Sequence, residues 1–291
     1  MKLIVENHYL RKIFGDREAI RIIAEAGFDG MDFSFFKLDE NDDILKKPNI
    51  KEYALSLKEY AKSLGVKFAQ AHAPLTHAYD DKSDFEEHFA EIVKSMEIAS
   101  YLDVPVIIVH SIKCPKNIDF DDVNRKFYGR LAPYCEKFNI RIGVENLFMR
   151  DKVRECFVGQ QGTPKEITAF VNTLDKKYFT VCLDTGHAAL TGCEPQDFIR
   201  GMNSELLTAL HIQDNDYKND RHWLPYSGKL DWNEITSALA EIGYKGNLTL
   251  EIMHFIDRYP DDLQPMALTF ACQVGRKLIK LIEEKQNGAI V

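Results

Sequence analysis

Short apolar runs alternate with longer amphipathic segments along the chain. The short runs are nearly continuous in apolar character, which is typical of strands buried on both faces. Eight strands are predicted, approximately at Leu3–Glu6, Met31–Phe35, Lys67–His72, Val106–His110, Arg141–Asn146, Phe179–Asp184, Leu207–Gln213 and Asn247–Ile252. Strands that alternate with helices in this way indicate a parallel sheet with right-handed crossovers, and eight strands are the number that closes a barrel.

Helix signals separate these runs. The stretches 83–86 (Ser-Asp-Phe-Glu) and 163–166 (Thr-Pro-Lys-Glu) have the spacing of capping boxes, and 231–234 (Asp-Trp-Asn-Glu) opens a third helix. Glycines at 27, 65 and 243 follow helical segments and precede strands, which predicts helix ends at these points.

The fold prediction is a single (β/α)8 barrel domain over residues 1–291. The length of 291 residues fits one such barrel with a few long loops. A doubly wound open sheet is the competing arrangement, but no Gly-x-Gly-x-x-Gly turn follows the first strand. No Pro/Ser/Gly-rich linker divides the chain.

Composition narrows the class of protein. The net charge of −8 argues against a protein whose main role is to bind phosphate backbones. No run of eighteen apolar residues predicts a membrane span, and the N-terminal apolar run is too short for a signal peptide. The six cysteines are scattered without a Cys-x-x-Cys pair. We therefore expect a cytoplasmic protein without a membrane partner, and assembly with copies of itself stays open.

The predicted strand ends are rich in residues that bind metals. In a barrel, the carboxyl ends of the strands form the rim where active sites lie. Residues at these ends and in the adjoining loops are His72, His110, Glu145, Asp184, His187, His211, Asp214, Asp220, Arg221, His222 and Glu251.

Each of these residues alone is explained as a loop anchor, a helix cap or a solvated loop residue. Together they put five of the nine histidines on one rim, with several carboxylates. Burying carboxylates together is costly unless cations compensate them. Imidazole with carboxylate suits zinc or manganese, while magnesium or cobalt also fits, so the pattern predicts a divalent-metal site.

These motifs resemble the xylose-isomerase-like barrel superfamily, which joins sugar phosphate isomerases and epimerases with zinc-dependent apurinic-site endonucleases. The resemblance is strongest at 144–146 (Val-Glu-Asn), 184–187 (Asp-Thr-Gly-His), 211–216 (His-Ile-Gln-Asp-Asn-Asp) and 250–251 (Leu-Glu). In the epimerase branch it implies that one ion is held by Glu145, Asp184, His211 and Glu251. Glu145 and Glu251 would also be the acid–base pair, with His187 touching the substrate.

The endonuclease branch carries further ligands, and this sequence has a counterpart for each. The resemblance implies that His72 and His110 join a first zinc, and that His187, Asp220 and His222 hold a third. Cleavage of DNA at abasic sites is therefore the rival function.

Three departures favour the sugar branch. Leu75 stands where the endonucleases have a tyrosine, their Gly-Ala-His opening is missing, and the chain is acidic. Within the sugar branch, Tyr217 stands where the epimerases have an arginine, which Arg221 would replace. Arg221 and His72 are accordingly further candidates for substrate contact.

The expected reaction is proton transfer beside a carbonyl group of a small sugar or sugar phosphate. One glutamate would remove a proton from carbon to give an enediolate, and the other would return it. A lyase that uses the same intermediate is also chemically possible. A catalytically silent sugar-binding barrel would not need the paired glutamates.

Overall fold

Eight parallel strands enclose the centre of the molecule. The computed structural model describes residues 1–36, 44–75, 85–115, 117–151 and 156–288. The strands are β1 (Leu3–Glu6), β2 (Gly30–Ser34), β3 (Lys67–His72), β4 (Val106–Val109), β5 (Arg141–Glu145), β8 (Phe179–Asp184), β9 (Leu207–His211) and β10 (Leu248–Leu250). They pair in the order β10-β1-β2-β3-β4-β5-β8-β9. A parallel bridge between Ile212 and Leu250 joins the two ends. The sheet is thus a nearly closed barrel, which confirms the predicted fold.

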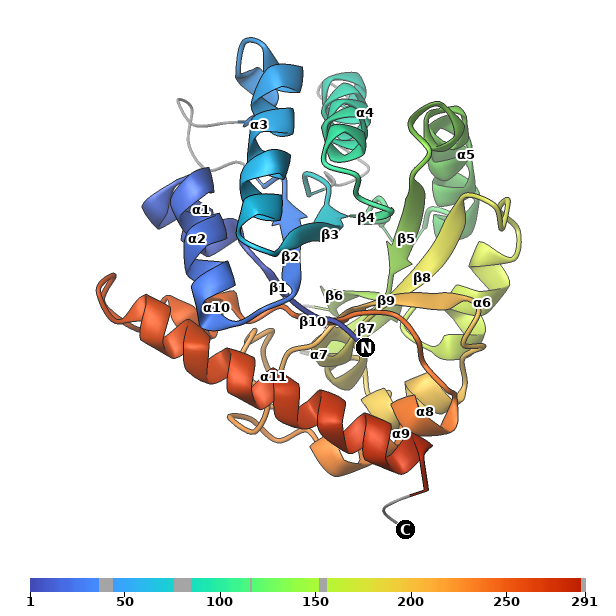
Figure 1. Ribbon diagram of the computed structural model, residues 1–291. Helices are drawn as coiled ribbons and strands as arrows, with labels where there is room; N and C mark the ends of the chain where they lie inside the picture. The colour runs from blue at the N-terminus through green and yellow to red at the C-terminus, as the bar shows by residue number, and fades with distance from the viewer. Residues whose placement is uncertain (37–43, 76–84, 116, 152–155, 289–291) are drawn as a thin grey trace.

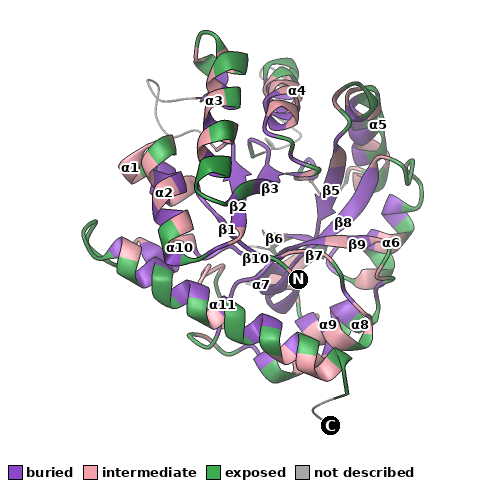
Figure 2. Cartoon of the chain, viewed as in Figure 1, coloured by how far each residue is buried: buried purple, intermediate pink, exposed green. Residues whose placement is uncertain are grey.

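Helices surround the strands on the outside (Figure 1). They are α1 (His8–Phe14), α2 (Asp16–Ala26), the 3-10 turn η1 (Ile44–Lys46), α3 (Ile50–Ser63), α4 (Phe85–Tyr101), α5 (Phe120–Phe138), α6 (Pro164–Val171), α7 (Thr185–Leu190), α8 (Pro195–Arg200), α9 (Trp232–Glu241), α10 (Met253–Ile256) and α11 (Gln264–Gln286). The strands are buried while the helices turn exposed faces to solvent (Figure 2). This is the arrangement that the continuous apolar strands and amphipathic helices predict.

The local signals read from the sequence act as expected where the structure describes them. Thr163 and Glu166 form the reciprocal capping box of α6, and the Asp231 side chain caps α9 by accepting from two backbone N–H groups. Gly27, Gly65 and Gly243 all have positive φ, the conformation in which glycine ends a helix. Ser83 and Asp84 lie outside the described residues.

Apolar residues pack in two separate places. The main core lies between the sheet and its helices. A small second cluster joins Ile108, Cys182 and Ala209, with Val106 against them. Because these residues come from β4, β8 and β9, which are not all neighbours, they meet across the inside of the barrel. Gly143 belongs to the same layer, since a Cβ there would lie 2.6 Å from the Ile108 side chain. The barrel is therefore filled, and is not a pore.

All eight predicted strands are present, and their ends differ by two residues or fewer. The sequence pattern did not predict the hairpin that follows β5. The segment after β5 forms an antiparallel hairpin of β6 (Leu147–Asp151) and β7 (Cys156–Gln160), separate from the barrel sheet. Because β6 begins two residues after Glu145, the last residue of β5, the hairpin lies next to the carboxyl ends of the barrel strands.

No helix in the described ranges is long and apolar enough to cross a membrane.

Candidate metal centre

Strand alternation explains why the candidate ligands meet. Successive side chains of a strand point to opposite faces, so the residue two positions beyond an interior residue also points inward. Ile108, Cys182 and Ala209 fill the barrel interior. Two positions after each stand candidate ligands at the rim, which are His110, Asp184 and His211. The sequence thus places polar ligands directly above an apolar layer.

The central group contains Glu145, Asp184, His211 and Glu251. One ligand atom from each lies within 4.8 Å of the others, and all four residues are buried. The Nδ1 atom of His211 is 2.9 Å from Oε1 of Glu145 and 3.5 Å from Oε2 of Glu251. This is the four-ligand set that sequence analysis predicted for one divalent ion.

A second group shares Glu145. The Nε2 atom of His110 is 2.7 Å from Oε2 of Glu145, and Nε2 of His72 is 3.6 Å from the same oxygen. The two Nε2 atoms of His72 and His110 are 3.2 Å apart. Glu145 therefore faces histidines on both sides, with one oxygen toward His211 and the other toward His110.

A third group contains His187, Asp220 and His222. Oδ2 of Asp220 lies 3.6 Å from Nε2 of His187 and 3.1 Å from Nε2 of His222. The Gln213 side chain donates to Oδ1 of Asp220 at 2.8 Å, while its oxygen accepts from the backbone N–H of His222 at 2.9 Å. Gln213 thereby fixes the loop that carries this group.

The surroundings shift the pKa values of the two predicted acid–base glutamates in opposite directions. Burial alone would raise the pKa of Glu145, but the adjacent His211 and His110 hold it well below its ordinary value. At Glu251 burial prevails over His211 and His222, and it raises the pKa to about 8. In the metal-free protein Glu251 therefore holds its proton more tightly than Glu145 does.

The donor set fits a divalent cation. Three carboxylates and one imidazole are ligands that zinc and manganese accept. The Oε2 atom of Glu251 is buried and accepts no hydrogen bond from any described residue. A buried carboxylate oxygen without a donor is costly, and a cation between Glu251 and Glu145 would remove that cost.

These residues line a cavity of about 300 Å³. Its polar end is formed by His72, His110, Glu145, His187, Asp220, His222 and Glu251, and the rest by Phe36, Leu75, Lys113, Leu147, Phe148 and Met253. The volume suits a small molecule.

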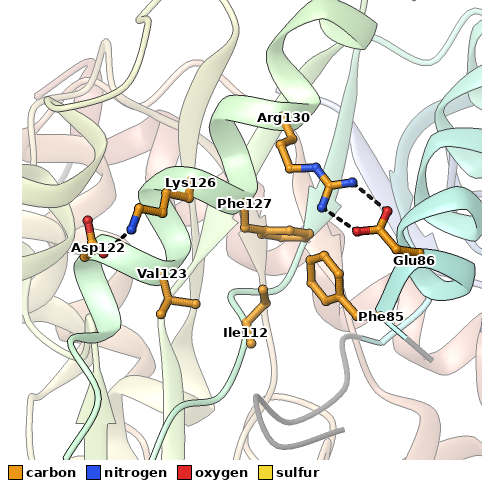
Figure 3. A pocket seen from close by; sticks show the side chains of 8 residues that line it. All are labelled: Phe85, Glu86, Ile112, Asp122, Val123, Lys126, Phe127 and Arg130. Atoms are coloured by element: carbon orange, nitrogen blue, oxygen red, sulfur yellow. Dashed lines mark hydrogen bonds and ion pairs between the residues drawn. The ribbon is translucent and has the colours of Figure 1, made fainter. Parts of the chain in front are cut away.

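A second hollow, between α4 and α5, has a different character. It is lined by Phe85, Phe127 and other apolar groups, and its cations are neutralised in ion pairs, Arg130 with Glu86 and Lys126 with Asp122 (Figure 3). None of the predicted site residues lines it. The cavity with the converging ligands is therefore the candidate site.

Comparison with known proteins places the chain in a family. Residues 20–267 match the family model described as xylose isomerase-like TIM barrel. The chain belongs to the xylose isomerase-like TIM barrel family.

Solved structures share the family fold along nearly the whole chain. A D-tagatose 3-epimerase-like protein has a TM-score of 0.76 and 22% identity, over 98% of this chain and 99% of that one. D-psicose 3-epimerase with D-tagatose, from Clostridium cellulolyticum H10, has a TM-score of 0.74 and 18% identity, over 96% and 99%. The IolI protein with a bound zinc atom has a TM-score of 0.71 and 17% identity, over 98% and 99%.

Two of the rim residues named in the sequence analysis, Arg221 and Asp214, lie apart from the three groups of candidate ligands. Arg221 pairs with Asp216 at 3.1 Å and stacks near Trp223, and it is not among the residues that line the cavity. Asp214 accepts from Trp232 Nε1 and from two backbone N–H groups, so it anchors the long loop before α9.

Several groups to which the sequence analysis assigned no role contact the candidate ligands. Asn146 donates to the backbone oxygen of Asp184 at 3.0 Å and accepts from its N–H at 2.7 Å. Asp32 lies 3.1 Å from the second nitrogen of His211. Phe148, on the unpredicted hairpin, packs edge-on against His187. Asp32 places a charged residue inside an apolar strand, and this break in the apolar pattern could have marked Asp32 as a candidate site residue.

Proposed function

We propose that this protein is a divalent-metal-dependent enzyme that isomerises or epimerises a small sugar or sugar phosphate. The main support for this proposal is the pair of carboxyl groups of Glu145 and Glu251. The two carboxyls belong to one four-ligand group and line one cavity. Isomerisation and epimerisation both need a base that removes a proton from carbon and an acid that returns one, and both groups must reach the bound substrate.

Glu145, Asp184, His211 and Glu251 would hold the ion. When bound, it would supply positive charge beside the carbonyl and hydroxyl oxygens of the sugar. IolI is described with zinc, which supports zinc as one candidate, and the ligand set also accepts manganese, magnesium or cobalt. Membership of a family whose solved structures include sugar epimerases supports the substrate class.

The side chains of the protein would carry the proton. One glutamate removes it from the carbon beside the carbonyl, which leaves an enediolate, and the other returns a proton to the neighbouring atom or to the opposite face. His187 would contact the substrate, because it lines the cavity while its Nδ1 lies 2.9 Å from the backbone oxygen of Asn146. His72 is placed similarly, with Nδ1 2.8 Å from the backbone oxygen of Ala73.

The experiment is a conversion assay with ketoses and ketose phosphates, read by NMR. We expect at least one substrate to be converted to an isomer or epimer. Exhaustive chelation should abolish the conversion, and zinc or manganese should restore it. Conversion that persists at full rate in the chelated protein would contradict the proposal.

The second candidate is a zinc-dependent endonuclease for abasic sites. The observation in its favour is that two further groups, His72–His110–Glu145 and His187–Asp220–His222, adjoin the central one. Three clustered ions would suit hydrolysis of a phosphodiester. Against it stand the net charge of −8 and Leu75, an exposed apolar residue at the cavity. Three zinc ions per chain, with efficient incision of a duplex that carries one abasic site, would favour this candidate.

A further inference from the structure

A carboxylate outside the ligand groups lies beneath the metal centre. Asp32 stands in the middle of β2, with no exposed surface. It belongs to none of the groups that could hold an ion among the described residues. A buried carboxylate in a barrel interior is costly unless its oxygens accept hydrogen bonds, and of the two Asp32 oxygens only Oδ2 has hydrogen-bond partners among the described residues. Its contacts therefore indicate what it does there.

Asp32 contacts a predicted metal ligand. Its Oδ2 atom is 3.1 Å from Nε2 of His211 and accepts from the Gln70 side chain at 2.6 Å. Gln70 in turn accepts from Thr249 at 3.3 Å. The contacts join β2, β3, β9 and β10, and every member is buried. Gln70 and Thr249 thus hold the Asp32 carboxylate in one orientation toward His211.

The two nitrogens of His211 face different partners. Nδ1 faces Glu145 and Glu251, the carboxylates of the central group, and Nε2 faces Asp32. A neutral imidazole carries one N–H, and the other nitrogen offers the lone pair that binds a metal. Donation of Nε2–H to Asp32 leaves the Nδ1 lone pair directed at the other ligands.

We propose that Asp32, held by Gln70 and Thr249, is the positioning residue that fixes the tautomer and ring orientation of His211, so that Nδ1 binds the divalent ion. This inference rests on the proposed metal site. Carboxylates that accept from metal-ligating histidines commonly increase metal affinity by about 10- to 100-fold. Asp32 acts through His211 and does not touch the substrate.

The test compares zinc affinity, by calorimetry on chelated protein, between the wild type, Asp32→Asn and a matched control. The control is Glu6→Gln. Glu6 is the register neighbour of Asp32 on β1 and is also buried, but its carboxylate accepts from the backbone N–H of His8 at 2.6 Å. It hydrogen-bonds none of the predicted ligands in the described part of the chain.

We expect Asp32→Asn to weaken zinc binding about 10- to 100-fold, with a metal-free melting temperature close to that of the wild type. Glu6→Gln should weaken zinc binding less than Asp32→Asn does, because Glu6 acts on Asp32 and His211 only through space and its loss leaves the contact between Asp32 and His211 in place. Equal zinc affinity in Asp32→Asn and wild type, or an equal loss in Glu6→Gln, would overturn the inference. If the wild type binds none of zinc, manganese, magnesium and cobalt, the proposed function itself fails.

A second measurement does not depend on any variant folding. Nitrogen-15 NMR of the histidine side chains in the zinc-loaded wild type distinguishes the two ring nitrogens. We expect His211 to carry its proton on Nε2 and to bind zinc through Nδ1. A proton on Nδ1 would overturn the assignment of Asp32.

Discussion

At the scale of single residues, the environment gives chemically identical groups different pKa values. Glu145 has a histidine beside each oxygen, at 2.7 and 2.9 Å. Glu251 has a buried oxygen that accepts no hydrogen bond from the described residues. In the metal-free protein the surroundings thus favour the ionised form at Glu145 and the protonated form at Glu251, whereas a bound cation would favour the ionised form of both.

Substitution of either glutamate tests its proposed acid–base role. Glu145→Gln and Glu251→Gln keep the size of the side chain but can no longer exchange a proton. We expect each to lower turnover by at least about 100-fold, because a positioned acid or base contributes about 10²–10⁴-fold. Circular dichroism should show an unchanged fold, and calorimetry should report how much zinc each variant retains. Turnover near that of the wild type in a metal-loaded variant would remove that glutamate from the mechanism.

Glu6 makes the stability of the metal-free protein depend on pH. Burial, reinforced by Asp32, raises the pKa of Glu6 from 4.5 to about 7. The folded state therefore holds this proton more tightly than the unfolded state. The stabilisation is complete below about pH 4.5 and is lost as the pH rises through 7.

Glu6→Gln stays neutral at every pH and removes this dependence. In urea denaturation of metal-free protein, we expect the free energy of unfolding to change with pH differently in the wild type and the variant between pH 5 and pH 8. The wild type should lose up to about 3 kcal/mol more than the variant over that range. Parallel stability curves for the two proteins would show that Glu6 is not buried as a neutral acid.

At the scale of elements, strand alternation determines the site. His110, Asp184 and His211 are predictable from sequence, because strand position and the two-residue period together fix both the end and the face on which they lie. Asp32 and Gln70 occupy mid-strand positions, where a polar residue has no role until its partner across the barrel is known. The β6–β7 hairpin was missed because its apolar residues have no tight-turn signature between them and because a helix was expected to follow β5.

Gly275 tests the packing of α11 on the barrel. A Cβ at this position would lie 2.5 and 2.9 Å from the two terminal carbons of Leu3, which is fully buried. We expect Gly275→Ala to lower the free energy of unfolding by about 1–3 kcal/mol through overpacking.

Gly129 in α5 is the matched control, because a Cβ there meets nothing within 4 Å. Gly129→Ala should stabilise the protein by about 0.5–1 kcal/mol, since alanine has the higher helix propensity. Urea denaturation measures both variants. Stabilisation by both alanines would contradict close packing of α11 against β1.

At the scale of the whole molecule, the repeated strand–helix unit determines the fold, and closure of the sheet brings the candidate ligands together. Eight apolar strands in parallel bury both faces, and the bridge between Ile212 and Leu250 joins the ends of the sheet. This closure brings Glu251, from the last strand end, beside His211 and opposite Glu145. The fold class and the gathering of nine candidate ligands at one end of the barrel could be predicted from the sequence. The distances among the ligands could not, because they depend on how the barrel closes.

Exchange of a carbon-bound proton with solvent tests the central claim most directly. The wild-type protein, loaded with zinc or manganese, is incubated in deuterated water with a ketose that it converts, and the sugar is analysed by NMR. Because Glu145 or Glu251 would take the proton before it is returned, we predict that deuterium appears at one carbon beside the carbonyl, and that chelation stops this. Conversion with complete retention of the original hydrogen would contradict the account. So would efficient incision of an abasic-site duplex without exchange in any sugar.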